Sequence, residues 1–143
     1  MTFDEIYACT QNLSILYVED EKDIRESTTR LLENYFKRVD VAKDGKEGLK
    51  YYTNSLQNNP YDIVLSDINM PDLDGLEMFK KIRELRANQT VVLVTAHREE
   101  EFAAEAIMLG VDDFLFKPVK LDELAKVIFH TAQSLADKDK TNK

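Results

Sequence analysis

Short runs of apolar residues alternate five times with longer segments in which apolar residues recur at helical spacing. Four of the runs are nearly continuous, which is typical of strands covered on both faces in a parallel sheet. The second run alternates between apolar and polar residues and therefore favours an edge strand with one wet face. The predicted strands are Ser14–Val18, Val39–Ala42, Ile63–Ser66, Thr90–Val94 and Asp113–Phe116.

The segments between the runs carry apolar stripes that predict five amphipathic helices. Asp44-Gly45 and Asp74-Gly75 stand where helices are expected to begin, and Gly110 stands where the fourth helix is expected to end. Fivefold alternation of strand and helix predicts an α/β fold with a parallel sheet and right-handed crossovers. The stripes are Ile24, Leu31, Leu32, Tyr35 and Phe36; Leu49, Tyr52 and Leu56; Leu76, Phe79, Ile82 and Leu85; Phe102, Ala106, Ile107 and Leu109; and Leu121, Leu124, Ile128, Ala132 and Leu135.

The length of 143 residues predicts one domain. We expect residues 1–13 to be an N-terminal extension, residues 14–136 to form the domain and residues 137–143 to be a polar, frayed tail. The formal net charge of −8 argues against nucleic acid or an anionic membrane as the main partner. The single cysteine, Cys9, cannot form an internal disulfide. Because no signal peptide or long apolar span is apparent, a cytoplasmic location is expected.

Polar residues directly follow four of the predicted strands. Ligands of an open parallel sheet bind beyond the carboxyl ends of its strands, so these residues are expected to meet at one edge. Each of them alone has an ordinary explanation, such as a helix cap or a solvated charge, but all of these explanations would be needed at the same edge. The residues are Glu19-Asp20-Glu21 after the first strand, Asp67 after the third, Thr95 after the fourth and Lys117-Pro118 after the fifth.

This set of residues matches the requirements of phosphoryl transfer. Three carboxylates placed together disfavour joint ionisation, and a hard divalent cation, Mg²⁺ or Mn²⁺, removes that cost. One carboxylate then remains available as a nucleophile. The cation, the Lys117 ammonium and the Thr95 hydroxyl would each take one oxygen of the transferring group.

Five motifs follow one another along roughly Ser14 to Leu135. They are Tyr17-Val18-Glu19-Asp20-Glu21, Ala42-Lys43-Asp44-Gly45-Lys46-Glu47-Gly48-Leu49, Ser66-Asp67-Ile68-Asn69-Met70-Pro71-Asp72-Leu73-Asp74-Gly75, Val94-Thr95-Ala96 and Gly110-Val111-Asp112-Asp113-Phe114-Leu115-Phe116-Lys117-Pro118. Each motif alone has little specificity, whereas all five in this order are highly specific. With them the sequence resembles the receiver domains of two-component response regulators. The resemblance implies a flavodoxin-like, doubly wound five-stranded parallel sheet with strand order 2-1-3-4-5 and helices on both faces.

The resemblance implies a role for each residue at the expected edge. Asp67 would be the phosphoacceptor and a metal ligand, and Asp20 would be a direct Mg²⁺ ligand. Glu19 would act through water or by orienting the site, and the backbone carbonyl of Asn69 would be a further ligand. Lys117 would contact both Asp67 and the phosphoryl group.

The resemblance also implies residues that respond to phosphorylation. Thr95 would move toward the phosphoryl group, and Phe114, at an aromatic switch position, would then turn inward. The Lys117–Pro118 peptide bond is expected to be cis. Asn69 and His97, each two residues beyond a site residue, would tune the lifetime of the phosphoryl group.

The implied function is a switch driven by phosphorylation, in a protein that catalyses only its own phosphorylation and dephosphorylation. A sensor histidine kinase or phosphotransfer protein would donate the phosphoryl group. The surface formed by the fourth helix, the fifth strand and the fifth helix would signal to a downstream effector protein or output domain. Dimerisation through this surface is a habit of the family. Direct contact with nucleic acid or a membrane is not expected.

Three alternative functions are weighed against this one. A degenerate receiver that acts by contact without phosphorylation would lack a site residue, and none is missing. A phosphatase with an aspartate nucleophile would carry Asp-x-Asp after the first strand, where this chain has Glu19-Asp20-Glu21. A flavin or nucleotide carrier would need a phosphate-binding glycine loop, and the chain has only four glycines.

Overall fold

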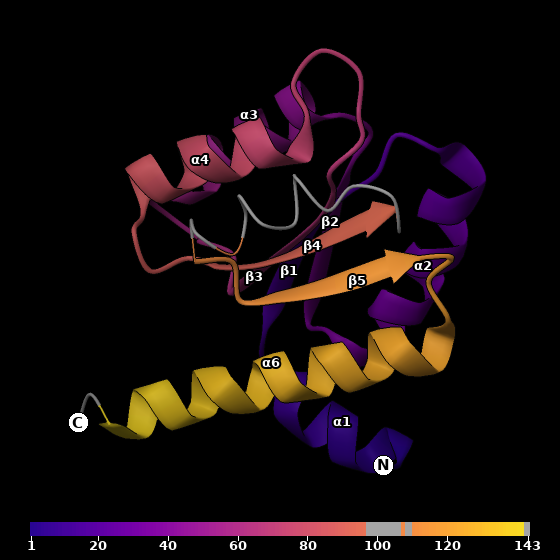
Figure 1. Cartoon of the computed structure of the whole chain (residues 1–143). Coiled ribbons are helices and arrows are strands. Elements are labelled where there is room, and N and C mark those ends of the chain that lie inside the picture. The colour runs from indigo at the N-terminus through magenta and orange to yellow at the C-terminus, as the bar shows by residue number, and fades with distance from the viewer. Residues whose placement is uncertain (97–106, 108–109, 142–143) are drawn as a thin grey trace.

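The computed structural model describes residues 1–96, 107 and 110–141, and a five-stranded sheet runs through its centre (Figure 1). The strand order is β2-β1-β3-β4-β5, and every neighbouring pair is parallel, which confirms the predicted topology. Within the described part of the chain, β2 pairs only with β1, in agreement with its alternating edge pattern. The strands are β1 (Ser14–Val18), β2 (Arg38–Ala42), β3 (Ile63–Asp67), β4 (Thr90–Ala96) and β5 (Asp113–Lys117).

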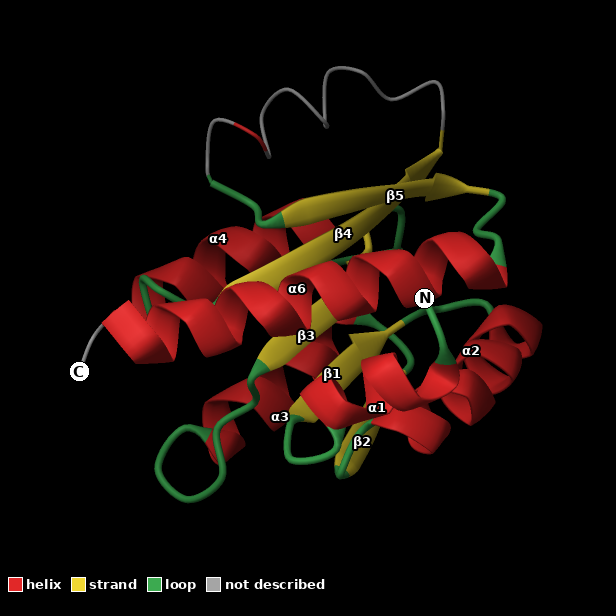
Figure 2. Ribbon diagram, turned by 90° about the horizontal axis from the view of Figure 1, so that it is seen from below, coloured by secondary structure: helices red, strands yellow, loops and turns green. Residues whose placement is uncertain are grey.

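Helices cover both faces of the sheet (Figures 1 and 2). One face lies under α3 and α4, and the other lies under α1, α2 and α6. Among the described helices, none combines the length and the apolar character needed to span a lipid bilayer. Most of the predicted stripe from Phe102 to Leu109 lies outside the described residues. The helices are α1 (Phe3–Thr10), α2 (Lys22–Tyr35), α3 (Gly45–Ser55), α4 (Gly75–Leu85) and α6 (Leu121–Thr141).

Two apolar layers, one on each face of the sheet, form the core. Successive residues of a strand point to opposite faces, so Leu16 enters the layer under α3 and α4, whereas Ile15 and Tyr17 enter the other layer. Phe79 of α4 fills the first layer, and Leu124 of α6 fills the second. The continuous apolar runs of the central strands therefore have their physical cause in burial on both sides.

Three strands extend further at their carboxyl ends than their apolar runs predicted, and β2 begins one residue earlier, at Arg38. Asp67 is the last residue of β3 and is aligned with Val94 of β4. β4 continues through Thr95 to Ala96, and the alignment of Ala96 with Lys117 extends β5 by one residue. Backbone pairing continues past the last apolar side chain of each run. As a result, the sheet itself, rather than a loop, positions three of the predicted site residues.

The predicted N-terminal extension contains a helix that the sequence pattern did not predict. The Thr2 side chain caps α1 by accepting a hydrogen bond from the Glu5 N–H at 3.2 Å. Ile6 and Thr10 are buried, and the Thr10 hydroxyl donates to the carbonyl of Tyr35 at 2.8 Å. α1 packs against both α6 and α2 (Figure 2). The first residues of the chain are therefore joined to the domain by burial and hydrogen bonding.

The frayed tail expected at residues 137–143 is wrong for its first part, because α6 continues to Thr141. This segment contains no Gly or Pro, so nothing in it interrupts a helix that is already formed. In addition, Lys138 Nζ lies 3.8 Å from Asp112 Oδ1, which links the end of α6 to the segment before β5.

Gly75 allows α4 to begin directly against the end of β3. Its N–H donates to the Ile68 carbonyl at 2.9 Å, and a β-carbon at this position would overlap the Asp67 carbonyl oxygen. We expect Gly75→Ala to lower the free energy of unfolding by about 1–3 kcal/mol, the usual cost of overpacking. Urea denaturation would measure the change. Lys50→Ala, at an exposed position of α3, is the control, and equal stability of both variants would contradict the prediction.

Candidate functional site

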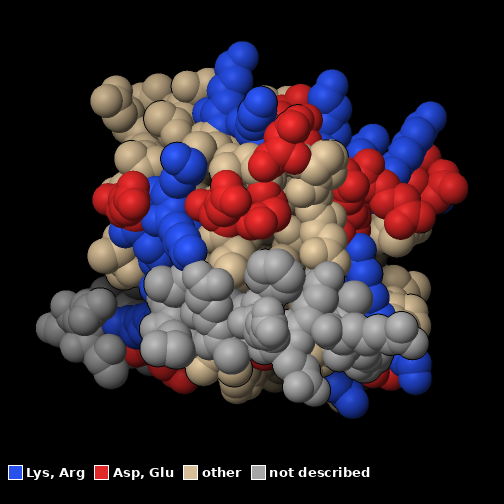
Figure 3. Space-filling model, turned by 45° about the horizontal axis from the view of Figure 1, so that its top comes forward, with Lys and Arg blue, Asp and Glu red and all other residues tan. Residues whose placement is uncertain are grey.

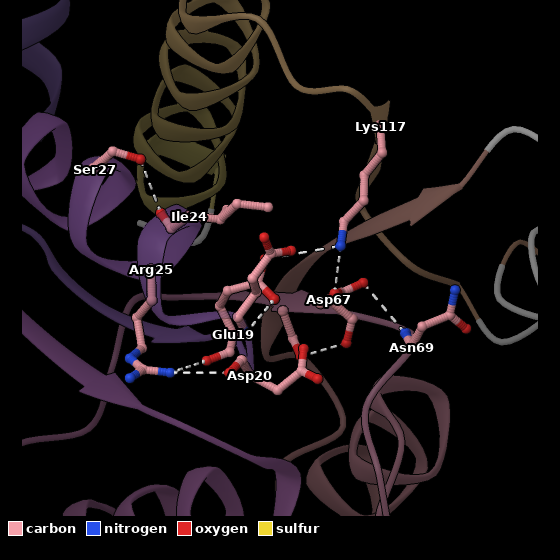
Figure 4. A network of polar contacts seen from close by, with 10 residues as sticks. Glu19, Asp20, Ile24, Arg25, Ser27, Asp67, Asn69 and Lys117 are labelled. Carbon is pink, nitrogen blue, oxygen red and sulfur yellow. Dashed lines mark hydrogen bonds and ion pairs between the residues drawn. The ribbon is translucent and has the colours of Figure 1, made fainter.

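The carboxyl ends of β1, β3 and β5 bring three carboxylates and one ammonium group together (Figure 4). Glu19 and Asp20 follow β1, Asp67 ends β3 and Lys117 ends β5. One carboxylate oxygen each of Glu19, Asp20 and Asp67 lies within 4.8 Å of the others. Lys117 Nζ lies 2.6 Å from Asp67 Oδ2 and 3.9 Å from Glu19 Oε1. Four residues predicted to share a site thus form one cluster of charges.

Burial makes it costly to keep all the carboxylates of this cluster ionised. Glu19 and Asp67 are each only 2% exposed, whereas Asp20 is exposed. Burial, followed by the negative charge of Asp67, raises the pKa of Glu19 to about 8. Burial also lowers the pKa of Lys117, but the hydrogen bond and charge of Asp67 and the charge of Glu19 outweigh it and leave that pKa raised. Lys117 therefore stays an ammonium, while the carboxylates still carry excess negative charge.

Backbone groups hold the two buried carboxylates in place. The Glu21 N–H donates to Glu19 Oε2 at 3.3 Å, and the Asn69 N–H donates to Asp67 Oδ1 at 3.2 Å. On either side of the exposed Asn69, the side chains of Ile68 and Met70 are buried, which anchors the backbone after β3. The Asn69 carbonyl, predicted to be a metal ligand, therefore belongs to a segment fixed on both sides.

The remaining predicted residues lie on β4 and β5 or directly after them. Thr95 is fully buried in β4, one residue beyond the position aligned with Asp67. Phe114 is partly buried and packs against the apolar layer under α3 and α4. The Lys117–Pro118 peptide bond is cis. His97, predicted to tune the lifetime of the phosphoryl group, lies outside the described residues.

One residue of this site was missed by the sequence analysis. Arg25 of α2 donates hydrogen bonds from Nη1 to the carbonyl oxygens of Glu19 at 3.0 Å and of Asp20 at 3.2 Å. The only sequence clue was an arginine in the first turns of the helix that follows the acidic motif. Because its partners are backbone atoms, no pairing of side-chain types could have revealed it.

The acidic cluster could hold a divalent cation. All three candidate side chains offer oxygen atoms, which suit hard cations such as Mg²⁺ and Mn²⁺ better than softer metals. The exposed position of Asp20 leaves room for the water molecules that Mg²⁺ retains. The raised pKa of Glu19 shows that its negative charge is poorly compensated within the protein. A bound cation would supply the missing positive charge and favour the ionised carboxylate.

Acidic and basic side chains are mixed on one face of the molecule. On the face seen in Figure 3, the coloured Lys and Arg side chains lie among Asp and Glu side chains. Three carboxylates and one ammonium account for only a small part of the formal net charge of −8, so most of that charge lies outside the acidic cluster.

Comparisons with known proteins agree with the fold. The family model for the response regulator receiver domain matches residues 15–129. The transcriptional regulatory protein DltR of Streptococcus agalactiae is 37% identical over 123 residues, which cover 85% of this chain and 53% of DltR. The regulatory protein AtoC of Escherichia coli is 35% identical over 121 residues, which cover 83% of this chain and 25% of AtoC. The chain thus spans about half or less of these relatives.

Solved structures show the same architecture. A response regulator receiver domain protein from Clostridium thermocellum superposes with a TM-score of 0.77 at 26% identity, covering 92% of this chain and 99% of that one. The match therefore extends over nearly the whole of both chains and supports the same overall fold.

Proposed function

The chain belongs to the family of response regulator receiver domains, and we propose that it accepts a phosphoryl group on Asp67 in a Mg²⁺-dependent reaction. One observation carries this proposal. The buried Asp67 carboxylate is bonded to the Lys117 ammonium and shares a cluster with Glu19 and Asp20. This arrangement combines a nucleophile, a fixed cation and oxygen ligands for a metal in one place.

Each residue then has a defined part in the reaction. A carboxylate oxygen of Asp67 attacks phosphorus, and a new O–P bond forms while the bond from phosphorus to the donor's leaving atom breaks. Glu19 and Asp20 would hold Mg²⁺, which when bound neutralises charge on the transferring group. The Lys117 ammonium lies 2.6 Å from Asp67 Oδ2. It would balance negative charge on Asp67 and on the transferring phosphoryl group. Asn69 would supply its carbonyl as a further ligand.

Phosphorylation would be transmitted through β4 and β5. In this proposal the Thr95 hydroxyl bonds to the phosphoryl group and Phe114 moves further into the apolar layer. About 5.5 kcal/mol of differential stabilisation would shift such an equilibrium from 1:99 to 99:1. The surface that includes β5 and α6 would then present a different shape to its partner.

The partners follow from this switch. We propose a sensor histidine kinase or phosphotransfer protein as donor, and an effector protein or output domain as receiver of the signal, in a cytoplasmic setting. DltR and AtoC are named as regulatory proteins, which supports a regulatory output. Homodimerisation through the β5 and α6 surface, and tuning of the phosphoryl lifetime by Asn69 and His97, are parts of the same proposal.

Intact-mass measurement with acetyl phosphate tests the proposed function. With Mg²⁺ present, the protein is expected to gain one phosphoryl group, which peptide mapping should locate at Asp67. Hydroxylamine should remove this group as inorganic phosphate, as expected for an acyl phosphate. With EDTA, no gain is expected. Beryllofluoride in the presence of Mg²⁺ covers the case of rapid hydrolysis, since it mimics the phosphoryl group without turnover. If neither reagent modifies or binds the protein, it is a contact-only receiver and the proposal fails.

A further inference from the structure

We propose that Arg25 is a positioning residue for the divalent cation, because its guanidinium holds the backbone that carries Glu19 and Asp20. This inference rests on the proposed Mg²⁺-dependent phosphorylation and extends it to a residue outside the acidic cluster. Arg25 lies on α2, and its side chain reaches back toward the carboxyl end of β1 (Figure 4).

The hydrogen bonds of Arg25 restrain both peptide planes that flank Asp20. Nη1 donates to the Glu19 carbonyl at 3.0 Å, and that oxygen belongs to the peptide before the Asp20 α-carbon. The same nitrogen donates to the Asp20 carbonyl at 3.2 Å, and that oxygen belongs to the peptide after it. With both planes held, the φ and ψ angles of Asp20 are restrained. The direction in which the Asp20 side chain leaves the backbone is then set.

Asp20 depends on this support more than Glu19 does. The Glu19 carboxylate is buried and contacts the Glu21 N–H and the Lys117 ammonium. Asp20 is exposed, so packing does little to orient its side chain. A clamp on the backbone is therefore the structural means by which this exposed carboxylate is directed toward Asp67.

The contacts of Arg25 also leave the metal-ligating oxygens accessible. Its guanidinium bonds to carbonyl oxygens of the turn, so its positive charge offsets the acidic turn without occupying the carboxylate oxygens of Glu19 or Asp20. An arginine paired with these carboxylates would compete directly with a cation. Partners outside the ligand set commonly contribute a factor of about 10–100 to metal affinity.

Calorimetric titration with Mg²⁺ tests the inference without measuring the reaction. Arg25→Ala is expected to weaken Mg²⁺ binding by about 10–100-fold relative to the wild type. Arg30→Ala is the matched control, because it removes the same charge from an exposed position of the same helix, and its affinity should stay within about threefold of wild type. Equal Mg²⁺ affinity of the Arg25→Ala variant and the wild type would overturn the inference.

Acetyl phosphate labelling as a function of Mg²⁺ concentration separates positioning from a general structural role. In Arg25→Ala, the Mg²⁺ concentration that gives half-maximal labelling should rise by the same factor as the dissociation constant. The labelling rate at saturating Mg²⁺ should stay close to that of the wild type. A lower maximal rate with an unchanged midpoint would show a merely structural effect and contradict the inference.

Arg25→Lys keeps the test decisive if Arg25→Ala fails to fold. Lysine retains the charge but lacks the planar guanidinium that is held across two carbonyls, so an intermediate Mg²⁺ affinity is expected. Wild-type affinity in this variant would show that charge alone suffices and would overturn the backbone-clamp role. If the wild type itself neither binds Mg²⁺ nor takes up a phosphoryl group, the proposed function fails, an outcome distinct from failure of the inference about Arg25.

Discussion

Replacement of Asp67 with Asn is expected to abolish uptake of a phosphoryl group from acetyl phosphate. The carboxamide keeps nearly the same shape but has no anionic oxygen to attack phosphorus. It also removes one negative charge from the group that would hold the cation and weakens the contact with Lys117. Intact mass after incubation with Mg²⁺ and acetyl phosphate should therefore show only the unmodified variant.

Asp72→Asn is the matched control for this loss. Asp72 lies in the exposed loop after β3 and adopts a left-handed backbone conformation with φ of 66°, which asparagine also tolerates. Its labelling should equal that of the wild type. Labelling of Asp67→Asn at the wild-type level would mean that another residue accepts the phosphoryl group.

The metal-free protein is expected to lose stability as the pH rises from about 4.5 to about 8. Burial and the charge of Asp67 raise the pKa of Glu19 to about 8 in the folded protein, from an ordinary value of 4.5. Between these values the folded state binds more protons than the unfolded state, so the free energy of unfolding falls with increasing pH. At about 1.36 kcal/mol per pKa unit, the stability lost across this pH range is on the order of 5 kcal/mol.

Glu19→Gln should remove this part of the pH dependence, because its side chain does not titrate. Urea denaturation in EDTA at several pH values would measure the difference between the variant and the wild type. Glu33→Gln, at an exposed position of α2, should keep the wild-type slope. Saturating Mg²⁺ should flatten the wild-type curve, since a bound cation favours ionised Glu19. If the free energy of unfolding depended on pH equally in the wild type and in Glu19→Gln, this pH dependence could not be assigned to Glu19.

The sheet was predictable because its central strands are buried on both faces. Ile63-Val64-Leu65 is continuous in apolar residues since neighbours on opposite faces enter different layers of the core. The carboxyl ends of the strands could not be predicted from the apolar pattern. Asp67 and Lys117 are polar, and backbone pairing with adjacent strands, which leaves no apolar pattern, keeps them in the sheet.

The helix at the N-terminus shows where local patterns fail. Only Ile6 and Thr10 of α1 are buried, whereas Phe3 and Tyr7 are exposed, so an apolar stripe does not identify the inner face. Thr10 is satisfied by the carbonyl of Tyr35, which lies 25 residues away in the sequence. Tertiary contacts of this kind stabilise a short helix whose own pattern is weak.

The grouping of the site residues was accessible because carboxyl ends of parallel strands share one edge. This rule correctly grouped Glu19, Asp20, Asp67 and Lys117. It did not reveal Arg25, which approaches from a helix and contacts backbone oxygens. The distances within the site and the burial of Glu19 could be known only from the three-dimensional structure. The direction of the Glu19 pKa shift depends on both and was therefore not predictable from the sequence.

The bond between Lys117 and Asp67 joins residues 50 positions apart, and this separation has a consequence for biosynthesis. Translation proceeds from the N-terminus, so β1 and β3 emerge from the ribosome well before β5. The nascent chain thus carries its buried acidic residues before their ammonium partner exists. A chain that stops short of β5 has no Lys117 to offset them, so the charged cluster becomes complete only when nearly the whole domain has been synthesised.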